Sequence, residues 1–227
     1  MIAVRRFVRD CGLSLFFGLI FLLALAGQAW AGWKAFNAEQ SADQLAPLTL
    51  PQYLTSASFA GDVAENWQSE YLQFLLYIVI TVWLLQRGSP ESKEMDKAGL
   101  ESDRDQKVGE YAEPDSPRWA RVGGLRTRIY SSSLALVMGT IFLGSWLAQS
   151  IAGCAAYNEA RLRQLQAPIS WSSYLTNPDF WSRTLQNWQS EFLAVASMVV
   201  LSIYLRQRGS PESKPVGEPH HRTGIEG

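Results

Sequence analysis

Long apolar runs alternate with polar segments along the chain, and these runs are the main guide to its fold. Residues 13–33 and 134–154 contain no charged side chain. About twenty such residues form a helix that crosses the roughly 30 Å hydrocarbon core of a membrane. Shorter apolar runs follow at residues 71–85 and 192–205. The pattern predicts an all-α fold, an integral membrane four-helix bundle made of two helical hairpins.

Two motifs occur twice. The stretch QRGSPESK ends both hairpins, NWQSE precedes both of the shorter apolar runs, and one offset of 121 residues relates the copies. Between residues 13 and 93 this offset needs no gap and matches roughly 40 per cent of the paired positions. The chain is therefore interpreted as two tandem copies of one unit.

The repeat sets the expected domain boundaries. Transmembrane hairpin repeat 1 covers residues 1–93, and transmembrane hairpin repeat 2 covers residues 129–214. Residues 94–128 are polar and form the linker, while residues 215–227 form the tail. Because neither polar segment has enough apolar residues to form a core, both are expected to be disordered.

The outer loops carry local helix signals. Asn177, Pro178 and Asp179 combine an N-cap, a proline at the first helical position and an early acid, which predicts that the last helix begins at Pro178. Short interfacial helices are expected at residues 51–56 and 171–176.

The first apolar run has an alternative interpretation as a secretory signal. Basic residues precede it, and Ala29-Trp30-Ala31 resembles a cleavage site. However, Ala31-Gly32 has a counterpart at Ala152-Gly153, far inside the chain. Because a cleaved leader has no reason to have an internal twin, the repeat favours a retained helix.

Basic residues predict the orientation in the membrane. Sixteen of the 20 Lys and Arg residues precede the first helix, lie between the hairpins or follow the last helix, and four lie in the two remaining loops. The positive-inside rule then places both termini and the linker in the cytoplasm, with the protein in the inner membrane.

The duplicated octapeptide has two interpretations. Arginine at the interface, glycine at a helix end and a following proline form a structural stop signal. The last three positions are not explained in this way, which leaves room for a cytoplasmic docking motif. The candidate residues are Arg87, Gly88, Ser89, Pro90, Glu91, Ser92, Lys93, Arg208, Gly209, Ser210, Pro211, Glu212, Ser213 and Lys214.

Polar residues near the outer ends of the apolar runs form a second candidate cluster. Asparagine and glutamate of NWQSE are four residues apart and share a helix face. One hypothesis is that the cluster is hydrogen-bonding glue between helices; the other is that two glutamates meet and bind a proton or cation. Its members are Gln28, Asn66, Glu70, Gln149, Asn187 and Glu191.

Enzyme signatures are absent from the sequence. The only histidines, His220 and His221, lie in the tail, so no metal centre or other cofactor is expected. There is no glycine-rich phosphate loop and no nucleophile elbow. A formal net charge of −1 with scattered basic residues gives no footprint for nucleic acid.

At residues 187–214 the chain resembles a family of bacterial membrane proteins defined only as a domain of unknown function. Both repeats share the pattern, but repeat 1 has Leu85 where repeat 2 has Arg206. The resemblance implies a bacterial inner-membrane protein and no activity. We expect a non-enzymatic interaction or envelope-structural role, with the lipid bilayer and a cytoplasmic protein or a second copy as partners; the alternative is a small proton or cation transporter or channel.

Overall fold

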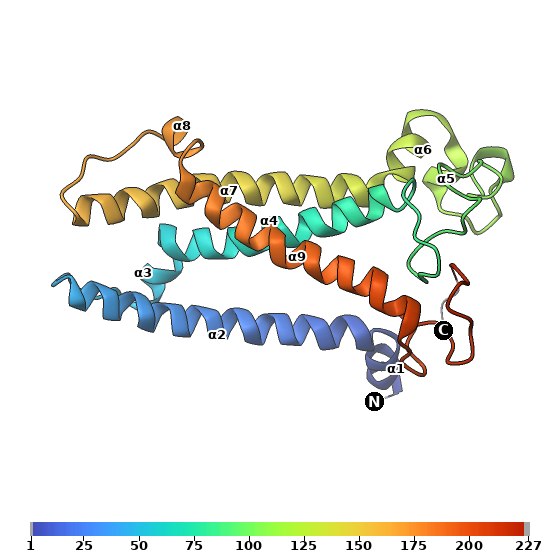
Figure 1. Cartoon of the computed structure of the whole chain (residues 1–227), viewed down its shortest axis with the longest axis horizontal. Helices are drawn as coiled ribbons and strands as arrows, with labels where there is room; N and C mark the ends of the chain where they lie inside the picture. Colours follow the sequence, from blue (N-terminus) through green and yellow to red (C-terminus); the bar gives the residue numbers. More distant parts are fainter. Residues whose placement is uncertain (1, 225–227) are drawn as a thin grey trace. The chain divides into compact units, whose positions relative to one another are not determined.

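The computed structural model of the protein describes residues 2–224 and contains only helices and loops within that range. The all-α fold class is thereby confirmed. The helices, coloured along the chain in Figure 1, are α1 (Ile2–Asp10), α2 (Gly12–Ala42), α3 (Leu50–Leu54), α4 (Ala57–Ile80), a 3₁₀ helix η1 (Gly109–Tyr111), α5 (Arg118–Val122), α6 (Gly124–Ser131), α7 (Ser133–Arg163), α8 (Trp171–Tyr174) and α9 (Pro178–Tyr204).

Helix positions follow the offset seen in the sequence. Helices α2 and α7 both have 31 residues, and α7 begins 121 residues after α2. The same separation relates the first residues of α3 and α8, and those of α4 and α9. The duplicated sequence thus forms the same succession of helices twice.

Local capping explains where two of these helices begin. The Asn177 side chain accepts a hydrogen bond from the Asp179 amide at 2.9 Å, and Pro178 opens α9 as expected. Before α3, Gln52 Oε1 accepts from the Thr49 amide at 2.8 Å, which satisfies one of the free donors at the helix start. The expected short helices are present as α3 and α8.

Only α2 and α7, among the described residues, are long and apolar enough to be candidate membrane spans. Helix α4 ends at Ile80, before the apolar run from residue 71 to residue 85 is complete. The Thr81 hydroxyl donates to the Tyr77 carbonyl at 2.6 Å, and the Gly99 amide donates to the Val82 carbonyl at 2.7 Å. Two spans are therefore supported, and a bundle of four is not confirmed.

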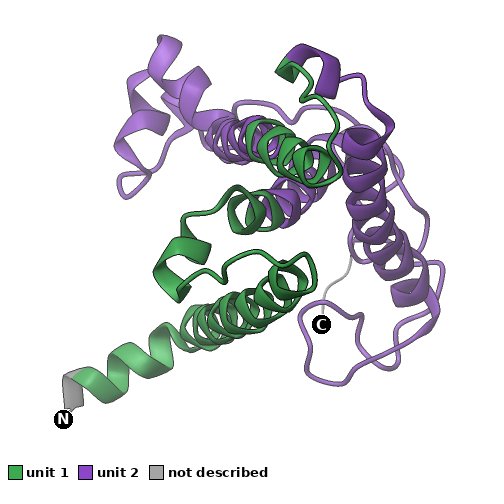
Figure 2. Ribbon diagram, turned by 90° about the vertical axis from the view of Figure 1, so that its left-hand side faces the viewer, with its two compact units in different colours: residues 1–63, 150–171 green, residues 64–149, 172–227 purple. Residues whose placement is uncertain are grey.

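The chain forms two compact units, shown in Figure 2. Unit 1 contains residues 1–63 and 150–171, and unit 2 contains residues 64–149 and 172–227. Each unit therefore takes residues from both repeats.

Unit 1 is centred on Tyr53. This side chain is buried, with its ring 5.6 Å from the ring of Phe36 and 5.4 Å from that of Phe59. Gly32 is required beside it, because a β-carbon at Gly32 would lie 2.3 Å from the Tyr53 hydroxyl oxygen.

The linker contains η1, α5 and the beginning of α6. Thr127 Oγ1 donates to the Trp119 carbonyl at 2.6 Å, and Lys107 pairs with Glu113 at 2.8 Å. The disorder expected for the linker and the tail stays a prediction. Residues 1 and 225–227, at the ends of repeat 1 and of the tail, lie outside the described residues.

Candidate functional site

The two NWQSE copies contact each other inside unit 2, one from α4 and one from α9. The Trp188 indole donates to Gln68 Oε1 at 2.8 Å. Ser69 forms a side-chain hydrogen bond with Glu191, and Glu70 is close enough to interact electrostatically with that carboxylate. The structure therefore brings the two glutamates of the candidate cluster together.

The buried residues of the first copy are not those that the pattern singled out. Gln68 is fully buried, whereas Asn66 and Glu70 share a helix face that is exposed. The face of α4 that packs inside includes Ala64, Gln68 and Leu72, at the four-residue spacing of one side of a helix. That spacing is the signal by which Gln68 could have been found.

The remaining members of the cluster have separate environments. Gln149 is 1 % exposed, and its Nε2 donates to Thr184 Oγ1 at 3.2 Å. Asn187 Nδ2 donates to the Arg183 carbonyl of its own helix at 2.9 Å. Gln28 lies in α2 and belongs to unit 1. The observed hydrogen bond of Gln149 thus goes to Thr184, a residue that no sequence pattern indicates.

An aromatic cluster surrounds this polar contact. The Trp146 ring lies 6.0 Å from the ring of Trp188, 6.2 Å from that of Phe180 and 5.7 Å from that of Phe142. Within the described chain, Trp146 Nε1, Gln68 Nε2 and Gln149 Oε1 are buried without a hydrogen-bond partner. In an apolar surrounding such groups are costly, so the remaining bonds of Gln68 and Gln149 matter for stability.

Charged residues flank the cluster at the beginning of α9. Arg183 Nη1 lies 3.0 Å from Glu65 Oε1, and the Tyr174 hydroxyl donates to Asp179 Oδ2 at 3.1 Å. Burial, followed by the negative charge of Asp179, raises the pKa of Tyr174 well above its usual range. The tyrosine therefore remains a neutral hydrogen-bond donor.

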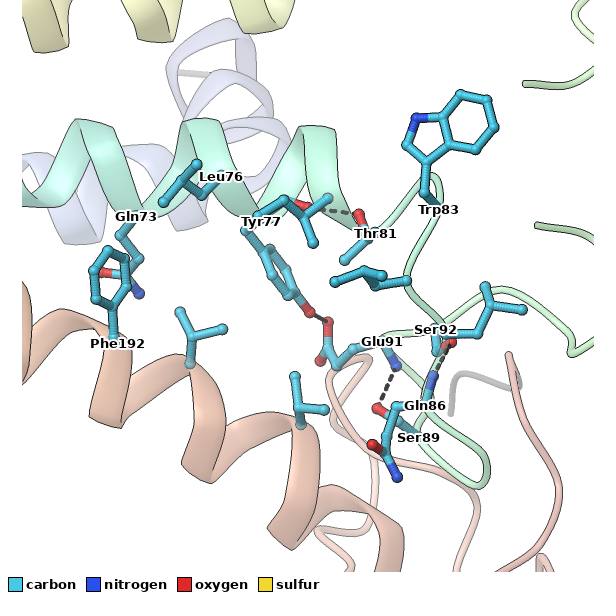
Figure 3. A pocket seen from close by; sticks show the side chains of 15 residues that line it. Gln73, Leu76, Tyr77, Thr81, Trp83, Gln86, Ser89, Glu91, Ser92 and Phe192 are labelled. Carbon is cyan, nitrogen blue, oxygen red and sulfur yellow. Dashed lines mark hydrogen bonds between the residues drawn. The ribbon is translucent and has the colours of Figure 1, made fainter. Parts of the chain in front are cut away.

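The first octapeptide forms a loop held by its own serines. Gln86 N donates to Ser92 Oγ at 2.9 Å, and Glu91 N donates to Ser89 Oγ at 3.2 Å, as the dashed lines in Figure 3 show. Gly88 has a φ of +87°, a left-handed conformation that favours glycine. Tyr77, which belongs to α4 and lies outside the loop, donates its hydroxyl hydrogen to Glu91 Oε2 at 2.6 Å.

The second octapeptide repeats this internal geometry. Gln207 N donates to Ser213 Oγ at 2.9 Å, Glu212 N donates to Ser210 Oγ at 3.2 Å, and Gly209 has a φ of +81°. Of the last three positions, which the stop-signal interpretation had left open, the serine (Ser92 and Ser213) is therefore explained by the loop itself.

The two octapeptides also contact each other within unit 2. Lys214 is 1 % exposed, and its Nζ donates to the carbonyl of Gly88 at 2.6 Å. Its other acceptors are the carbonyls of His220 at 3.0 Å, Arg222 at 3.1 Å and Pro219 at 3.3 Å. Burial, and next the charge of Arg206, lower the pKa of Lys214, while Glu218 raises it less.

Comparison with known proteins identifies the family. A model of a domain of unknown function, DUF6766, matches residues 4–225. The chain belongs to the DUF6766 family. No curated protein matches the chain, and no solved structure does. The expectation of an uncharacterised family is confirmed, and the bacterial origin stays a prediction.

In this DUF6766 chain both duplicated motifs make contacts between their own copies. The described residues include no group of three or more His, Cys, Asp or Glu placed to hold a metal ion. What the arrangement provides is hydrogen bonding: NWQSE joins α4 to α9, and QRGSPESK joins the loop after α4 to the loop after α9.

Proposed function

We propose that this DUF6766 protein is a non-enzymatic integral membrane protein with an interaction or envelope-structural role. The observation that carries the proposal is the exposure of its apolar helices. The most apolar windows of α2 and α7 are 0 % and 11 % buried within the structure. Burial of one large apolar side chain contributes about 1.5–3 kcal/mol, so water is a poor solvent for these surfaces and lipid is a good one.

The proposed arrangement has four crossings. Helices α4 and α9 have 24 and 27 residues, enough to cross the roughly 30 Å hydrocarbon core. With basic residues concentrated before α2, between the hairpins and after α9, the termini, the linker and both octapeptides lie in the cytoplasm.

Single-cysteine labelling tests this topology. Cys11 and Cys154 are free and are first replaced by serine. A membrane-impermeant maleimide should then label Gln166→Cys in intact spheroplasts, and Ser102→Cys only after lysis. Labelling of Ser102→Cys before lysis, or release of the chain by alkaline carbonate, would contradict the proposal.

The interaction role concerns the octapeptides. Ser92 and Ser213 are buried, whereas Arg87 and Arg208 are exposed, so a partner would contact the arginines. A photo-cross-linker at Arg208 should capture a cytoplasmic protein or a second copy, and one at Gln166 should not. Recovery of lipid adducts alone from Arg208 would count against a protein partner.

The alternative is proton or cation handling, and the electrostatic contact between Glu70 and Glu191 favours it. Two nearby carboxylates hold a proton or a cation more readily than one. The double variant Glu70→Gln, Glu191→Gln should then abolish proton or cation flux in proteoliposomes. Flux equal to that of the wild-type protein, with folding intact, would dispose of this alternative.

A further inference from the structure

A cavity of about 660 Å³ lies in unit 2 between α4, α9 and the first octapeptide. Apolar side chains form most of its lining, among them Leu76, Ile80, Phe192, Val195 and Val199. Figure 3 shows Leu76 and Phe192 beside it, with Tyr77 and Glu91 meeting across it. Its volume is within the usual range of small-molecule sites, and its composition suits an apolar body with one polar group.

The charged group that lines the cavity is the carboxylate of Glu91, beside the uncharged polar side chains of Gln73, Thr81, Gln86, Ser89 and Ser92. Glu91 is half-buried and accepts the Tyr77 hydroxyl on Oε2 at 2.6 Å. Across residues 2–224 no Lys, Arg or His forms an ion pair with it. Lys93, the nearest lysine along the chain, pairs instead with Glu101 at 3.0 Å.

A second negative charge reinforces this preference. Glu212 is close enough to Tyr77 to interact electrostatically with it. An anionic head group would be repelled by both carboxylates, and a neutral one would leave the charge of Glu91 unbalanced in an apolar wall.

We propose that this cavity binds a lipophilic ammonium ion, with its ammonium group on Glu91 and its apolar body between α4 and α9. Such an ion balances the charge of Glu91 and buries apolar surface at the same time. An ammonium group of this kind occurs on a membrane lipid and on a free lipophilic amine, and the two sources share the chemistry of the site.

The test measures binding of octylammonium to the full chain in a neutral detergent by equilibrium dialysis. Binding should exceed that of octanol and of octanoate, which share the apolar chain and differ in charge. Glu91→Gln should weaken octylammonium binding by at least roughly tenfold, because a charge-assisted contact is lost. The matched comparison is Glu212→Gln, the same position of the second octapeptide; because Glu212 does not line the cavity and its charge acts only at longer range, this variant should weaken binding by less than about threefold.

Filling the cavity supplies an independent variant. Val199→Phe should weaken octylammonium and octanol alike, because it removes space and not charge. Circular dichroism and thermal unfolding establish that each variant is folded. Equal octylammonium binding by wild-type protein and Glu91→Gln, or no preference for octylammonium over octanoate, would overturn the proposal.

A final arm separates the two sources. In nanodiscs, phosphatidylethanolamine carries an ammonium group and phosphatidylglycerol does not. Octylammonium should then bind the wild-type protein more weakly in phosphatidylethanolamine than in phosphatidylglycerol nanodiscs if a lipid occupies the cavity. Glu91→Gln should show no such difference between the two nanodiscs. Equal binding in both nanodiscs, still dependent on Glu91, would support a free amine.

Discussion

The two octapeptides have the same eight residues and the same internal hydrogen bonds, yet they have different surroundings. In the first loop Gly88 and Pro90 are buried, whereas their counterparts Gly209 and Pro211 are exposed. The lysines are reversed: Lys214 is buried and Lys93 is half-buried. An identical sequence thus determines the local loop, while the chain that follows it determines what the loop contacts.

A single residue before the loop contributes to this difference. Arg206 stands where repeat 1 has Leu85, and its Nη2 donates to the Glu218 carbonyl at 2.9 Å. The tail is thereby held close to the second loop, where Pro219 and His220 accept from Lys214. The first loop has no such arginine before it.

The largest difference is expected between the two lysines. Lys214→Met should lower the free energy of unfolding by about 3 kcal/mol or more, because four backbone carbonyls lose their common donor. Lys93→Met should lower it by about 1 kcal/mol, because its contacts with Gly99 and Glu101 are partly exposed. Chemical unfolding in one neutral detergent measures both, and equal losses would contradict the asymmetry.

The second largest difference is expected between alanine substitutions of the two glycines, Gly88 and Gly209. Both have left-handed φ values, so alanine at either position costs about 1–2 kcal/mol. At Gly88 a β-carbon would also lie 2.4 Å from the His220 carbonyl oxygen, whereas at Gly209 it would meet nothing within 4 Å. Gly88→Ala should therefore be more destabilising than Gly209→Ala by about 1–3 kcal/mol in the same unfolding assay. A larger loss at Gly209 would mean that the tail does not cover the first loop.

The order of helices could be predicted from the sequence because its signals are local. Asn177 and Pro178 specify the beginning of α9 wherever that helix packs, and the repeat transfers the assignment to α4. The end of α4 could not be predicted in this way. The apolar run continues past Ile80, while the Val82 carbonyl accepts from Gly99, seventeen residues later. Non-local hydrogen bonds of this kind leave no periodic pattern.

The candidate site was predicted less completely for a similar reason. NWQSE has polar residues on both faces of a helix, so periodicity alone does not tell which face packs inside. Glutamate and asparagine have the chemistry of a proton or cation site, but Gln68 has the buried position and accepts the hydrogen bond from Trp188. In the octapeptide, the contacts of Lys214 depend on the tail, which the repeat does not include.

The two copies of NWQSE should also differ, at their glutamines. Gln68 is buried under Trp188, and its counterpart Gln189 is exposed. Gln68→Ala should lower the free energy of unfolding by about 2 kcal/mol, because the half-buried Trp188 loses the acceptor of its indole N–H and the buried position of Gln68 is left unfilled. Gln189→Ala should change it by less than about 0.5 kcal/mol. Similar losses at both positions would show that the two copies have equivalent environments.

Substitution of the serines should have the same effect in both copies. Ser92 and Ser213 each accept a backbone amide at 2.9 Å, so alanine at either should cost about 1 kcal/mol. Unfolding of the two variants should agree within about 0.5 kcal/mol. A clear difference would mean that the surroundings, and not the internal bonds, stabilise one of the loops.

The smallest effect is a pH dependence that belongs to Lys214. Its pKa is 10.5 in the ordinary, unfolded state and lower in the folded protein, because burial and Arg206 disfavour the ammonium. Between the folded pKa and 10.5 the unfolded chain binds more protons, so the contribution of Lys214 to the free energy of unfolding rises with pH there. Below the folded pKa both states are protonated and this contribution is constant.

The wild-type protein should therefore gain stability relative to Lys214→Met as the pH approaches 10.5. Differences between variants cancel the titration of groups that both share, and Lys93→Met, which retains Lys214, should keep the slope of the wild-type protein. If the free energies of unfolding of wild-type protein and Lys214→Met ran parallel with pH, folding would not lower the pKa of Lys214. A difference that falls as the pH rises would mean that the four carbonyls stabilise the ammonium more than burial and Arg206 destabilise it.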